Sequence, residues 1–204
     1  MSEVKFIQFS KLDLPSNEIS RREVLRYMGC KQSSEEIESL ISKGICECEE
    51  KLSYKVIYRE LPLAHNDGSL DLGFMTTKSQ DLRKALHGCD SCVLFAATLG
   101  LEIDRSINRY SHISPSLALA IQAIGAERIE ALCDKFSQQI KKLAAEDHKN
   151  ATPRFSPGYG DFPLEAQREI FKSLPCEKMI GVTLLDSLLM SPTKSVTAII
   201  GIKK

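Results

Sequence analysis

The residues best suited to chemistry lie in one irregular segment, positions 150–163. It reads Asn-Ala-Thr-Pro-Arg-Phe-Ser-Pro-Gly-Tyr-Gly-Asp-Phe-Pro, and its three prolines and two glycines exclude a helix or a central strand. Arg154 offers a planar fork that matches a carboxylate or a phosphate. Gly158 and Gly160 let the backbone approach a ligand closely, and Tyr159 adds a flat face and a hydroxyl. The segment suits a site for a small ligand that bears a carboxylate or a phosphate. Composition alone favours the other interpretation, a proline-rich connection whose aromatic side chains pack on the core.

A Cys-x-x-Cys pair is the second candidate for chemistry. Cys89 and Cys92 have the spacing of a redox or zinc motif, and His87 lies two residues upstream. A structural zinc site needs four ligands, and no second Cys-x-x-Cys or His-x-x-x-His completes the set. The apolar run 92–97 predicts a strand, whereas a redox motif would need a helix at its first cysteine. We expect a turn leading into a buried strand, with metal or redox chemistry as the alternative.

Other catalytic signatures are missing from the sequence. A dinucleotide fingerprint fails because Pro163 stands where its third glycine would be. There is no GxxxxGK[ST], HExxH or GxSxG, and the four histidines are scattered along the chain. The sequence therefore predicts neither a catalytic residue nor a metal site.

Composition narrows the class of protein. The 204 residues are 43% hydrophobic and 26% charged, which is typical of a globular chain. Lys+Arg and Asp+Glu are 27 each, so no basic excess suggests nucleic-acid binding. No apolar run is long enough for a membrane span, and no leader segment precedes the first elements. Seven cysteines, an odd number, fit a reducing compartment, and we expect a cytoplasmic protein.

Periodicity and capping signals predict the elements that must position these residues. Helices are expected over 20–28, 33–44, 79–86, 114–145 and 164–174, and strands over 55–61, 70–75, 92–98, 179–184 and 194–202. Helices dominate the early part of the chain and strands its end, so we expect an α+β fold rather than a doubly wound sheet. In this fold a long central helix and shorter helices pack against an antiparallel sheet, and residues 1–204 form a single domain.

The helix over 114–145 is the clearest element. Ser114-Pro115 supplies an N-cap and a first-turn proline. Its apolar residues recur at three- and four-residue steps, apart from a five-residue step around Gly125: Leu117, Ile121, Ile124, Ile129, Leu132, Phe136, Ile140 and Leu143. This stripe predicts a core face. Glu127, Glu130 and Asp134 form an adjacent stripe, which predicts a solvated acidic edge.

The irregular segment also resembles a known family. Arg154-Phe155-Ser156-Pro157-Gly158-Tyr159 is similar to the Arg-x-x-x-Gly-Tyr signature of the activation domain of cobalamin-dependent methionine synthase, especially its small free-standing relatives. The resemblance continues through Ile180–Leu184, Asp186-Ser187, Pro192 and Lys194–Gly201. It is strongest over 92–202, and residues 1–90 match loosely.

The resemblance implies a role in reactivation. Members of the family present S-adenosylmethionine so that cobalamin that has oxidised to cob(II)alamin can be reduced and remethylated. The implied partners are a cobalamin-dependent methionine synthase or another corrinoid protein, which supplies the cobalamin, and a flavodoxin- or ferredoxin-like electron donor. Because the cofactors carry the hard chemistry, the lack of an acid–base pair in this sequence is expected.

The resemblance also implies site residues. Arg154 would grip the methionyl carboxylate of S-adenosylmethionine, and Ser156, Pro157, Gly158 and Tyr159 would line the ligand. Glu130 aligns with an acid that faces the ligand's ammonium group. Two departures stand out. Gly160 replaces a proline of the full-length enzyme's domain, which predicts a looser loop, and the sequence ends at Lys204, before the family's tyrosine-bearing strand.

Three hypotheses follow for function. The first is a separate activation subunit for a corrinoid methyltransferase that lacks this domain. The second is an interaction module that docks on a corrinoid protein without binding S-adenosylmethionine, and the third is a small-molecule sensor. For Arg154 itself, the structural alternative is capping of the carbonyls at the end of the long helix.

Overall fold

An antiparallel sheet of five strands organises the computed structural model, which describes residues 3–204. The strands lie in the order β1 (Lys5–Phe9), β2 (Tyr54–Pro62), β6 (Ser91–Thr98), β10 (Ser195–Lys203) and β7 (Asn150–Ala151). Every neighbouring pair is antiparallel. The inner strands β6 and β10 therefore bring the middle of the chain against its C-terminal end.

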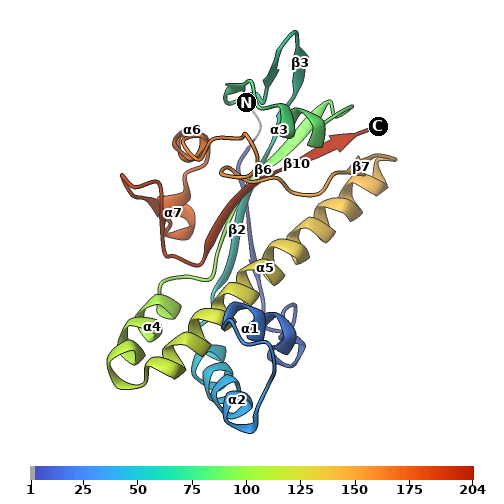
Figure 1. Ribbon diagram of the computed structural model, residues 1–204. Coiled ribbons are helices and arrows are strands. Elements are labelled where there is room, and N and C mark those ends of the chain that lie inside the picture. Colours follow the sequence, from blue (N-terminus) through green and yellow to red (C-terminus); the bar gives the residue numbers. More distant parts are fainter. Residues whose placement is uncertain (1–2) are drawn as a thin grey trace.

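The remaining elements surround this sheet. The helices are α1 (Arg21–Tyr27), α2 (Glu35–Glu49), α3 (Gln80–Ala85), α4 (Glu102–Ile113), α5 (Pro115–Glu146), α6 (Ala166–Ser173) and α7 (Cys176–Ile180), with a 3-10 turn at Ser16–Glu18. Two small sheets are formed by β3 (Ala64–Asn66), β4 (Ser69–Asp71) and β5 (Thr76–Thr77), and by β8 (Thr183–Leu184) and β9 (Met190–Ser191). Figure 1 shows α5 running along the sheet, with α1, α2 and α4 gathered near its N-terminal part. No helix within residues 3–204 is long and apolar enough to cross a membrane.

Both faces of the inner strand β6 are buried. Alternate residues of a strand point to opposite faces. In β6, Val93, Phe95 and Ala97 belong to the core that includes α5, while Leu94 and Ala96 belong to a second core with α6 and α7. Burial on both sides explains why this strand is an unbroken apolar run in the sequence.

The long helix packs one stripe on the sheet, as its periodicity predicts. Phe136 of α5 packs against Phe95 in a tilted arrangement, with ring centroids 4.8 Å apart. The irregular step at Gly125 has a packing reason, because a Cβ there would lie 3.2 Å from Ile103 of α4 and 3.0 Å from the Lys194 side chain. Leu143, at the end of the predicted stripe, is exposed.

The α+β class and the packing of a long helix on an antiparallel sheet are confirmed. Several local differences stand against the predicted elements. The strand predicted over 70–75 is wrong in its second part, because β4 ends at Asp71 and β5 begins only at Thr76. The helix α2 continues past its predicted end at residue 44 to Glu49, and β1 has no predicted counterpart. The predicted strand over 179–184 is wrong in its first part, because α7 extends to Ile180 and Gly181 then ends it in the left-handed conformation. The helix α4 has no predicted counterpart, and its N-cap position is Leu101, whose side chain provides no capping signal.

Candidate functional site

A groove of about 650 Å³ lies between α5 and the irregular segment. One wall is a stripe of α5: Glu130, Asp134, Ser137, Gln138 and Lys141. Steps of three, four and one residues place these side chains on one helix face. The opposite wall is formed by residues 152–157 together with Tyr159, and residues of α6, β9 and β10 complete the lining.

Arg154 joins the two walls. Its Nη2 lies 2.5 Å from Oε2 of Glu130, and its Nη1 donates to Oδ1 of Asp134. Burial opposes the charge of the guanidinium, but the hydrogen bond to Asp134 and the neighbouring carboxylates leave the pKa of Arg154 above its ordinary value. The arginine is therefore a fixed cation that bridges two acids on successive turns of α5.

The segment after Arg154 is irregular but anchored. Phe155 pairs with Ile199 of β10 through two backbone hydrogen bonds of 2.8 and 2.9 Å. Phe162 is buried in the core. Its carbonyl accepts a hydrogen bond from the N–H of Gly158 at 2.8 Å, and its own N–H donates to the carbonyl of Tyr159 at 3.0 Å. The Tyr159 ring, in contrast, is exposed at the rim of the groove.

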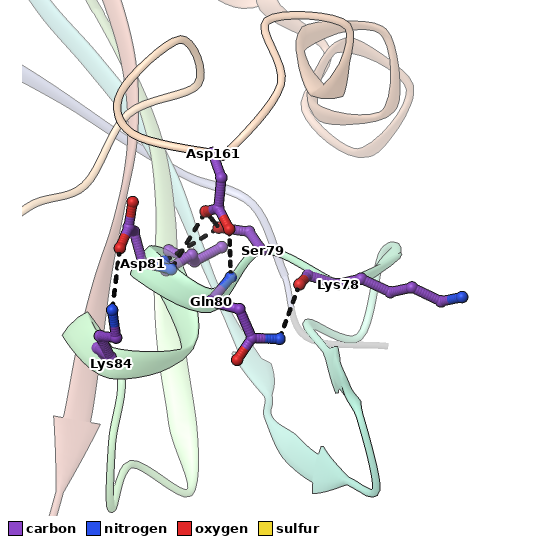
Figure 2. A network of polar contacts seen from close by, with 7 residues as sticks. Lys78, Ser79, Gln80, Asp81, Lys84 and Asp161 are labelled. Carbon is purple, nitrogen blue, oxygen red and sulfur yellow. Dashed lines mark hydrogen bonds and ion pairs between the residues drawn. The ribbon is translucent and has the colours of Figure 1, made fainter.

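Asp161 ties the far end of this segment to α3 (Figure 2). Its carboxylate accepts hydrogen bonds from the Ser79 hydroxyl, from the backbone N–H of Gln80 at 2.7 Å and from that of Asp81 at 3.1 Å. These donors lower the pKa of Asp161, the Ser79 hydroxyl having the largest effect. The segment expected to be loosened at Gly160 is thus held by hydrogen bonds at the next residue.

Buried polar groups from α6 and β10 complete the groove. Thr197 is buried, and its hydroxyl donates to Oε1 of Gln167 at 3.4 Å. Neither residue is singled out by the sequence, because a glutamine in a short helix and a threonine in a strand have no distinguishing spacing. Their placement depends on the packing of α6 against β10.

The comparison with known families decides where this chain belongs. The family model described as the vitamin B12 dependent methionine synthase activation domain matches residues 81–204, more than half of the chain. The chain belongs to this family. The match contains the irregular segment, α5, α6, β9 and β10, and so all the elements that line the groove.

A solved structure is similar to this activation-domain chain over its N-terminal part as well, which the family model does not match. A crystal structure titled as the MetH reactivation domain bound to AdoHcy superimposes with a TM-score of 0.74 and 15% sequence identity. The similarity covers 98% of this chain and 78% of that chain. At this identity the comparison shows a shared fold. No curated protein matches the chain.

The structure gathers most of the expected ligand residues of the activation-domain chain. Glu130, Arg154, Ser156, Pro157 and Tyr159 all line the groove. Gly158 does not line it and instead shapes the turn, with a φ of 89°. Asp134, predicted only as part of the acidic edge, is a direct partner of Arg154.

The prediction that Glu127 lies on a solvated acidic edge is wrong. This side chain is buried, and both its oxygens accept hydrogen bonds from Arg128, at 2.5 and 2.8 Å. Its Oε1 also accepts from the backbone N–H of Ser20 at 3.1 Å. Glu127 therefore ties the N-terminal segment to α5, because that segment covers the part of the helix that periodicity alone assigns to solvent.

The cysteine pair of the activation-domain chain lies in the hydrophobic core. Cys89 is in the turn before β6, and Cys92 is inside this strand. Burial raises the pKa of the Cys89 thiol and raises that of Cys92 to about 12. Among residues 3–204, no cluster of three or more His, Cys, Asp or Glu residues could hold a metal ion.

Proposed function

We propose that this chain presents S-adenosylmethionine to a corrinoid partner and so supports the reductive remethylation of oxidised cobalamin. One observation carries the proposal: a chain of the activation-domain family has a groove in which a guanidinium and a carboxylate lie 2.5 Å apart. The methionyl end of the ligand carries a carboxylate and an ammonium group on the same carbon. Adjacent charges of both signs in the groove suit such an end.

Each expected residue has a role in this proposal. Arg154 binds the methionyl carboxylate with its planar fork, and Glu130 binds the ammonium group. Ser156, Pro157 and Tyr159 line the remaining ligand, and Gly158 allows the turn that brings Tyr159 to the rim. When the ligand carboxylate binds Arg154, it displaces the Asp134 carboxylate, which then contacts solvent.

In this proposal the chain binds and orients the methyl donor, and it does not need a residue that transfers protons. S-adenosylmethionine supplies a methyl group, and one electron from a flavodoxin- or ferredoxin-like donor reduces the partner's cob(II)alamin, so that methylcobalamin and S-adenosylhomocysteine are the products. Holding the methyl donor in a fixed orientation makes an encounter between two proteins effectively unimolecular. The groove residues bind and orient the ligand, and the partner holds the corrinoid.

Calorimetry with Arg154 variants tests the proposal. Loss of one charge-assisted contact costs about 1.5–3 kcal/mol, or roughly 10- to 150-fold in affinity. Both Arg154→Lys and Arg154→Ala should weaken S-adenosylmethionine binding by this amount, because lysine keeps the charge but cannot form the fork. Both variants should also slow methylcobalamin formation, followed by absorbance with a corrinoid partner. Unchanged affinity in both variants, or no binding by the wild type at millimolar ligand, contradicts the proposal.

One observation favours the second candidate, an interaction module without S-adenosylmethionine. Both terminal nitrogens of Arg154 already contact carboxylates, so its fork is occupied within the chain. If these ion pairs persist, Arg154 is not available to a ligand carboxylate, and the surface serves only for docking on a partner protein. Binding to a corrinoid protein without measurable affinity for S-adenosylmethionine would support this function.

A further inference from the structure

The position of Tyr159 raises a packing question. Its side chain is 68% exposed, and glycines at 158 and 160 flank it on both sides. Glycine loses more backbone freedom on folding than any other residue, so a Gly-Tyr-Gly stretch without anchors would sample many conformations. Side-chain packing holds Phe162 on one side of the groove rim, but it does not hold Tyr159.

Backbone hydrogen bonds join Gly158 and Tyr159 to Phe162 within the segment, and the hydrogen bonds of Asp161 attach this turn to α3. The first N–H groups of a helix have no partners within the helix, and a carboxylate at this end is favoured by charge. At the N-cap of α3, the Ser79 hydroxyl accepts a hydrogen bond from the Leu82 N–H at 3.0 Å and donates one to Asp161. The Asp161 carboxylate also accepts hydrogen bonds from the backbone N–H groups of Gln80 and Asp81. Figure 2 shows Asp161 reaching from the irregular segment onto this helix start.

Gly160 allows this contact to form. Its φ is 53°, and a Cβ built there would lie 2.4 Å from Oδ2 of Asp81. A side chain at position 160 would push the segment away from α3 and separate Asp161 from its donors. The glycine and the aspartate that follows it therefore act together.

We infer that Asp161 is a positioning residue, which holds the Tyr159 rim of the groove against α3 so that the rim is in place before a ligand enters. The expected effect on ligand affinity rests on the proposed function: an ordered rim lowers the entropic cost of binding the ligand. The rim itself is a property of the free protein and can be measured without any ligand.

The first arm of the test is amide hydrogen exchange on the free protein. Asp161→Asn keeps the shape of the side chain but turns an NH₂ group toward donors. The amides of Gly158 and Phe162, which are hydrogen-bonded at the rim, should exchange faster in this variant than in the wild type. Asp67→Asn, in the exposed β3–β4 turn, is the matched control and should leave them unchanged. Unchanged exchange in Asp161→Asn overturns the inference.

The second arm is calorimetry with S-adenosylhomocysteine. Asp161→Asn should lower its affinity about tenfold, the equivalent of one charge-assisted hydrogen bond, and Asp67→Asn should not change it. Ser79→Ala removes one of the three donors to Asp161, together with the acceptor of the Leu82 N–H, and should give a smaller loss. This variant keeps the test available if Asp161→Asn does not fold. Wild-type affinity in the folded Asp161→Asn variant overturns the inference. If the wild type does not bind, the proposed function fails, and the exchange arm alone decides the role of Asp161.

Discussion

Two ion-pair clusters on α5, one turn apart, differ in what surrounds them. Glu127 and Arg128 have side chains that are 8% and 2% exposed, and they contact backbone groups of the N-terminal segment. Arg154 is 24% exposed, and its partners Glu130 and Asp134 are 45% and 63% exposed. The same residue types therefore form ion pairs in two different environments, and the acids of both clusters lie on one helix.

The difference in burial indicates different roles. Breaking a buried pair leaves an uncompensated charge away from water, whereas exposed charges are rehydrated when they separate. The Glu127–Arg128 pair is thus suited to holding elements together. The Arg154 cluster is suited to exchanging its contacts for those of a ligand.

The largest expected effect comes from the buried pair. Glu127→Gln should lower the free energy of unfolding by about 3–5 kcal/mol, because Arg128 keeps its buried charge without a carboxylate partner. Glu130→Gln, one turn away, should lower it by less than about 1 kcal/mol. Urea unfolding of the two variants measures the difference. Equal losses would remove the distinction between the clusters.

The exposed cluster should respond in ligand affinity instead. Glu130→Gln should weaken S-adenosylmethionine binding by about tenfold, because the ammonium group loses its charged partner. Asp134→Asn should strengthen binding by about twofold to fivefold, because the ligand carboxylate no longer competes with an exposed ion pair for Arg154. Titration calorimetry at constant ionic strength measures both. Weaker binding in Asp134→Asn would mean that Asp134 itself holds the ligand.

The smallest effect is a pH dependence at Asp161. Its pKa in the folded chain lies below the ordinary value of 3.8, so the charged form stabilises the fold above that value. The contribution is lost as the pH falls through the folded pKa. The wild type should therefore melt at a higher temperature than Asp161→Asn at neutral pH, and the gap should close in acid. Thermal melts of both proteins from pH 7 to pH 2.5 follow this gap, and a constant gap would contradict the assignment.

Local signals in the sequence account for much of the fold. Ser20 caps α1 as its capping signal predicts, and Pro115 begins α5. In α2 the cap is Ser34, one residue after the predicted start of the helix at 33. Periodicity predicts the stripe of α5 that packs on the sheet. These predictions succeed because a helix start and a helix face depend on residues within a few positions of each other.

The misassigned strand over 179–184 has a local explanation as well. Pro175 at the start and Gly181 in the left-handed conformation delimit α7, whereas the apolar run that follows Met179 suggests a strand. A five-residue helix is too short for periodicity to distinguish from a strand. The proline and glycine at its ends are the signal that could have located it.

By itself the sequence determined the class of fold and the long helix with its core stripe, and it pointed to the Arg-x-x-x-Gly-Tyr segment as the candidate site for a ligand. The tertiary structure alone decided which acids meet Arg154, that Glu127 is covered while Asp134 is not, and that Asp161 reaches α3, 80 positions away. The physical reason is that spacing gives the face of a helix on which a side chain lies, but burial depends on which distant segment packs over that face. For a charged residue, burial separates a structural ion pair from one that a ligand can displace.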